Sequence, residues 1–72
     1  MTMKEQCNKF FDDAISMYNR LSEFEQRCAD RATNGSSIQQ ESMLACNFNR
    51  GRTKAMEEAK QVMNEYFAKY LG

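Results

Sequence analysis

Apolar side chains recur along the first half of the chain at alternating spacings of four and three residues. The series is Met3, Cys7, Phe10, Ala14, Met17, Leu21, Phe24 and Cys28. This spacing places every member on one stripe of an α-helix, which predicts a long helix over about residues 3–33. Phe11, Ile15 and Tyr18 lie beside the stripe and widen it, so we expect this helix to be buried on two sides.

The stripe stops at the segment RATNGSSIQQE, residues 31–41. Asn34-Gly35 is typical of a helix end, and Ser36 or Ser37 followed by glutamine is typical of the capping box that begins a helix. We therefore predict a turn at 34–36 and a second helix over about 37–70. Its apolar positions are Leu44, Phe48, Gly51, Ala55, Ala59, Val62, Tyr66 and Tyr70.

A short loop makes the two helices antiparallel neighbours and pairs residues whose numbers add up to about 70. Phe10 then falls near Ala59, so large side chains of the first helix meet small ones of the second. Gly51 is favoured as a point of close contact in a continuous or gently kinked helix. The alternative is a break at Gly51, with Thr53 capping a third helix.

The short chain predicts one small all-α domain, residues 1–72, formed by an antiparallel hairpin of two long helices. A hairpin of this size leaves one apolar side uncovered and builds only a marginal core. We therefore expect it to form a homodimer, in which two hairpins make a four-helix bundle.

Composition argues against catalysis and against several kinds of site. The sequence has no histidine and three widely spaced cysteines, so we expect no enzyme, no metal site and no cofactor. The odd number of cysteines and the lack of an apolar leader segment predict a reducing, cytoplasmic environment. No apolar run exceeds four residues, so we expect no membrane contact.

Two groups of residues are candidates for binding. The aromatic end of the hairpin is expected to contact a second copy or another protein through Met3, Phe10, Phe11, Met63, Tyr66, Phe67 and Tyr70. A basic segment could contact nucleic acid through Asn47, Phe48, Asn49, Arg50, Arg52 and Lys54. Ten acidic and ten basic side chains give no net charge, which disfavours nucleic acid. We expect a non-enzymatic interaction or regulatory module that binds an unidentified protein, with a nucleic-acid-binding accessory protein as the alternative.

Overall fold

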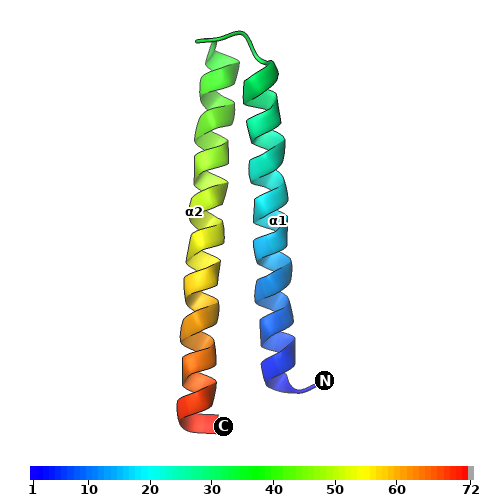
Figure 1. Ribbon diagram of the computed structural model, residues 1–72, viewed down its shortest axis with the longest axis vertical. Helices are drawn as coiled ribbons and strands as arrows, with labels where there is room; N and C mark the ends of the chain where they lie inside the picture. Colours follow the sequence, from blue (N-terminus) through cyan, green and yellow to red (C-terminus); the bar gives the residue numbers. More distant parts are fainter. Residues whose placement is uncertain (72) are drawn as a thin grey trace.

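The computed structural model describes residues 1–71, which form an antiparallel helical hairpin (Figure 1). Helix α1 spans Met3–Arg31 and helix α2 spans Ser37–Tyr66. A short π-helical segment, η1, continues α2 over Phe67–Leu71. The two termini lie together at the open end of the hairpin, opposite the loop (Figure 1). None of the described helices carries an apolar stretch long enough to cross a membrane.

Side-chain caps set where the helices begin. Thr2 accepts a hydrogen bond from the backbone N–H of Glu5 (3.2 Å), which starts α1. Ser36 accepts one from the N–H of Gln39 (3.1 Å), and the Gln39 side chain in turn accepts one from the N–H of Gly35 (2.7 Å). Gly35 has φ +79°, a backbone conformation that side-chain-bearing L-residues rarely adopt. The sharp turn therefore depends on a glycine at this position.

The helices pack along a seam that combines apolar side chains with small and polar ones. Its positions follow spacings of three and four residues, with one gap of seven between Ser22 and Ala29: Asn8, Phe11, Ile15, Tyr18, Ser22 and Ala29 on α1, and Ser42, Cys46, Asn49, Thr53, Met56, Lys60, Met63 and Phe67 on α2. Only two apolar side chains, Ala29 and Cys46, are fully buried among the described residues. The buried Thr53 hydroxyl finds its hydrogen-bond partner within its own helix, because it donates to the Asn49 carbonyl at 3.1 Å.

The apolar stripe expected inside the hairpin is instead exposed. Phe10 is 64% exposed and Phe24 is 53% exposed, and Ala59 is also open to solvent. The expectation of a doubly buried α1 is thus wrong for the single chain, and so is the pairing of Phe10 with Ala59. The reason is that the helices meet along the stripe displaced by one residue, where serine, alanine, cysteine and threonine let the backbones approach closely.

The predicted register is close to the observed one. Asn64 donates a hydrogen bond to Asn8, and Lys60 forms a salt bridge with Asp12. The Sγ atom of Cys46 lies 3.8 Å from Oε1 of Gln26. The residue numbers in each pair add up to 72, compared with the expected value of about 70. Residues at the same level of the two helices therefore have numbers that add up to about 72.

Helix α2 runs without interruption through Gly51. Gly51 is exposed, and a Cβ atom placed on it would meet no neighbouring atom within 4 Å. A continuous helix is thus confirmed, whereas the predicted close contact at Gly51 is wrong within the hairpin. The glycine lies on the outer surface of α2, where a side chain has room.

Candidate interaction surfaces

One broad side of the hairpin is apolar. On both helices, the residue immediately before each seam position lies on this side, because right-handed helices that run antiparallel turn these positions the same way. We call the apolar face this set with Met3 and Phe24, which continue its spacing, and without the charged Glu41 at its loop end: Met3, Cys7, Phe10, Ala14, Met17, Leu21, Phe24 and Cys28 on α1, and Ala45, Phe48, Arg52, Ala55, Ala59, Val62 and Tyr66 on α2. It extends along the full hairpin, and its large side chains are between 41% and 67% exposed.

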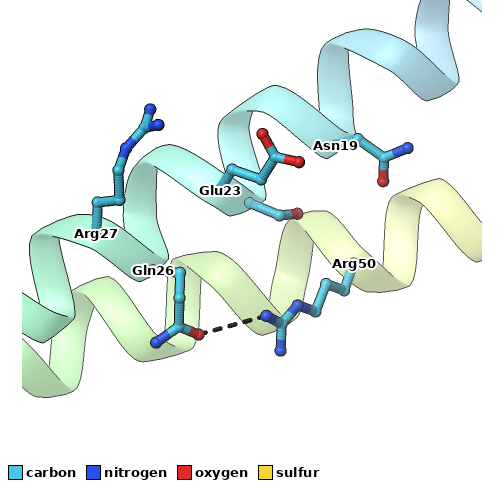
Figure 2. Close-up of a pocket in the computed structure, with 6 residues that line it drawn as sticks. Asn19, Glu23, Gln26, Arg27 and Arg50 are labelled. Carbon is cyan, nitrogen blue, oxygen red and sulfur yellow. Dashed lines mark hydrogen bonds between the residues drawn. The ribbon is translucent and has the colours of Figure 1, made fainter.

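The opposite side, which carries the residues immediately after the seam, is polar. Lys60 donates to Asp12 at 2.6 Å across this side, and Arg50 donates to Gln26 at 3.3 Å (Figure 2). Asn8 and Asn64 exchange two hydrogen bonds of 3.1 and 2.9 Å. These contacts lie on one side of the hairpin, because Asp12, Arg50 and Asn64 each directly follow a seam residue. We call this side the polar face.

The polar face contains a shallow cleft of about 500 Å³ (Figure 2). Its lining residues are Asn19, Ser22, Glu23, Gln26, Arg27 and Arg50. Amide, carboxylate and guanidinium groups line it, so the cleft offers both donors and acceptors of hydrogen bonds. Farther along α1, Lys9 and Asp13 form an exposed ion pair of 2.9 Å. The hydrogen bond to Asp13, and then the negative charge of Asp13, raise the pKa of Lys9 above its usual 10.5.

Arg52 is a cation within the apolar face. Its guanidinium carbon lies 4.1 Å from the ring centre of Phe48 and 5.5 Å from that of Tyr18. Stacking on aromatic rings allows a guanidinium to remain on an apolar surface while its edges stay free for hydrogen bonds. Arg52 is therefore positioned for pairing with an acidic group brought by a partner.

The residues predicted for the aromatic end divide between two environments. Met3, Phe10, Tyr66 and Tyr70 are exposed, whereas Phe11, Met63 and Phe67 are half-buried between the helices. The rings form two clusters, with centres 5.5 Å apart for Phe10 and Phe11 and 4.9 Å apart for Tyr66 and Tyr70. The exposed members continue the apolar face at the open end, so a partner there would also contact that face.

The six residues of the basic segment do not form one surface. Asn49 is buried in the seam, while Phe48 and Arg52 lie on the apolar face. Arg50 lies on the polar face and bonds Gln26. The two remaining residues, Asn47 and Lys54, are exposed and directly follow the seam residues Cys46 and Thr53, so they share the polar face with Arg50. The three cations of the segment are therefore divided between two faces, with Arg50 and Lys54 on the polar face and Arg52 on the apolar face.

Sequence reasoning missed the polar cleft and the full extent of the apolar face. Met17, Leu21, Phe24 and Val62 were not identified as exposed binding residues, because the stripe that contains them was expected inside the hairpin. The available signal was a second seven-residue repeat on α2, which runs from Ser42 through Cys46, Asn49, Thr53 and Met56 to Phe67. Its small and polar members are less conspicuous than the apolar stripe.

Among residues 1–71, no three histidine, cysteine, aspartate or glutamate side chains converge in a way that could hold a metal ion. Comparison with protein-family models, with curated proteins and with solved structures gave no match for this chain. The surfaces themselves are therefore the basis for a functional proposal.

Proposed function

We propose that the chain is a small non-enzymatic interaction module that forms a homodimer and binds another macromolecule. The observation that carries this proposal is the apolar face, which stays open along the whole hairpin, whereas only two apolar side chains of the described part of the chain are fully buried. A chain of this size needs more buried apolar surface than its own seam supplies. A second copy, covering the face, would complete the core.

The size of the face suits a stable dimer. The hairpin measures 53 × 20 × 11 Å between Cα extremes, so its broad side covers about 1,060 Å². A typical specific interface buries about 800 Å² on each partner. Two stacked hairpins would form a four-helix bundle, with both seams and both apolar faces in its interior.

The polar face remains free in such a dimer, because the apolar faces cover each other. Its cleft brings together hydrogen-bonding groups without a histidine and without an activated nucleophile. We therefore assign the second interaction, with another macromolecule, to the polar face. The hydrogen-bonding groups of the cleft favour a binding role over a catalytic one.

The mass in solution tests the dimer. Light scattering coupled to size exclusion should give twice the chain mass of 8.4 kDa at micromolar concentration. Phe24→Glu should shift the protein toward the monomer, because a buried phenylalanine contributes about 1.5–3 kcal/mol and two are lost per dimer. The matched control Asn19→Glu, on the polar face, should stay dimeric. A monomeric wild-type protein with a full helical spectrum would contradict the proposal.

The second interaction requires a separate experiment. Affinity capture from a lysate, with and without nuclease, should recover a bound macromolecule that is lost with Arg27→Ala/Arg50→Ala, while the variant remains a dimer. The alternative of a nucleic-acid-binding accessory protein has less support, because the basic residues of this segment are divided between the polar face and the apolar face of α2. Capture that disappears with nuclease would favour that alternative.

A further inference from the structure

The apolar face can be covered by a second copy in two symmetric ways. A two-fold axis parallel to the helices puts both loops at the same end and packs α1 against the partner's α2. An axis that crosses the helices at right angles puts the loops at opposite ends, with α1 against the partner's α1 and α2 against its α2. Oligomers of this kind are normally closed by such an axis. Charges along the face distinguish the two arrangements.

Four of the charged residues on or directly beside the apolar face lie in its middle third, whereas Arg27, Glu41 and Glu65 lie nearer its ends. Arg52 is part of the face, and Asp13, Arg20 and Glu58 each precede a face residue at its outer edge. All four are exposed in the hairpin. Charges that flank a helical interface set partner choice and orientation, because opposite charges attract across it and like charges repel.

With the axis parallel to the helices, each residue of the partner lies at the same height as in the first chain. Residues that face each other across the interface therefore have numbers that add up to 72, as they do within the hairpin. Asp13 then faces the partner's Glu58, since their numbers add up to 71. Arg20 faces the partner's Arg52, since theirs add up to 72. Both contacts are between like charges, and each occurs twice by symmetry.

With the axis across the helices, the same four residues form opposite-charge pairs. Asp13 faces the partner's Arg20 if the axis crosses α1 halfway between these residues, at position 16.5. Arg52 faces the partner's Glu58 if the axis crosses α2 halfway between them, at position 55. These midpoints add up to 71.5, so they lie at one level of the hairpin. A single axis near the middle of the face therefore satisfies both pairs, although they come from different helices.

The apolar side chains fit this axis as well. Val62 meets the partner's Phe48, since their numbers add up to 110, and Leu21 lies within two residues of the level of the partner's Ala14, so both layers combine a larger and a smaller side chain. We therefore propose that the partner on the apolar face is a second copy of this chain, bound with its loop at the opposite end. This arrangement rests on the proposed homodimer and adds its orientation.

Natural cysteines report on the orientation. The crossing axis brings Cys7 to within two residues of the level of the partner's Cys28, about 3 Å along the helix, and both residues belong to the apolar face. Within one helix the two are 21 residues apart, about 30 Å at 1.5 Å per residue, so they cannot be joined inside a chain. A short bismaleimide should therefore link them between chains and give a covalent dimer.

Peptide mapping of the linked dimer should show Cys7 joined to Cys28. Cys7→Ala and Cys28→Ala should each abolish the link, whereas Cys46→Ala, at a residue buried between the helices, should leave it in place. Dimer mass without this link, or linked dimer that persists in Cys7→Ala, would overturn the orientation but keep the dimer. Monomer mass would overturn both proposals.

Charge reversal gives an independent test, since the two arrangements predict opposite signs. In the crossed dimer, Arg20→Glu and Asp13→Lys should each raise the dissociation constant by roughly 2- to 10-fold, and the double variant should restore it. With the axis parallel to the helices, each single substitution would tighten the dimer instead. Analytical ultracentrifugation at low salt measures the difference, and tighter single variants would refute the proposed orientation.

Discussion

Replacing Gly51 by alanine should stabilise the protein. Gly51 lies in the interior of α2, is exposed, and has nothing within 4 Å of the position that a Cβ atom would occupy. Alanine would therefore reduce the entropy lost when α2 forms without meeting a clash. The gain expected for an exposed helix interior is about 0.8–1.0 kcal/mol per helix.

The proposed dimer doubles this effect, because both copies of α2 unfold in the same transition. The gain is then about 1.6–2 kcal/mol per dimer, which corresponds to a rise in Tm of roughly 4–8 °C for a protein of this total size. Urea and thermal unfolding followed by far-UV circular dichroism measure both quantities at one fixed protein concentration.

Gly35→Ala is the matched control. Gly35 has φ +79°, where an alanine is strained, so this substitution should lower stability by about 1–2 kcal/mol per chain. Opposite signs at the two glycines are the expected result. Destabilisation by Gly51→Ala would show that α2 meets a close neighbour there, and an unchanged stability would indicate that Gly51 lies outside a helix.

Two further predictions concern the seam and the basic segment. Ala29→Leu should destabilise the protein by about 1–3 kcal/mol in urea unfolding. The reason is that Ala29 is only 2% exposed, so a larger side chain would force the helices apart, and equal stability would show that the seam is loosely packed. Replacing Arg50, Arg52 and Lys54 by alanine should change nucleic-acid affinity little, as measured by fluorescence polarisation at two salt concentrations, and a tight, salt-sensitive complex abolished by the triple variant would instead favour the nucleic-acid alternative.

The sequence was sufficient for the hairpin but not for the way its helices face each other. Asn34-Gly35 and the following serine indicated the turn, and the observed cap at Ser36 uses the glutamine side chain expected of a capping box. The short loop then determined which levels of the two helices are adjacent, to within about two residues.

Periodicity could not decide which of two neighbouring stripes lies between the helices. On α1, the apolar stripe through Phe10 and Phe24 and the seam through Tyr18 and Ser22 differ by one position, a rotation of about 100°. Hydrophobicity favoured the first stripe, whereas close approach of the backbones favoured the second. The rotation also determines that Gln26 and Arg50 line one cleft. The cleft could therefore not be predicted from the sequence either.

The dependence of thermal unfolding on protein concentration tests most directly whether a second copy completes the fold. If folding and dimerisation are coupled, each tenfold increase in concentration adds about 1.4 kcal/mol of stability. For two chains of 72 residues, this corresponds to a rise in Tm of roughly 4–5 °C per tenfold step. The proposed homodimer should show this rise over a hundredfold range of concentration. A Tm that stays constant over that range would show that the hairpin is stable alone and that no second copy is needed to complete the fold.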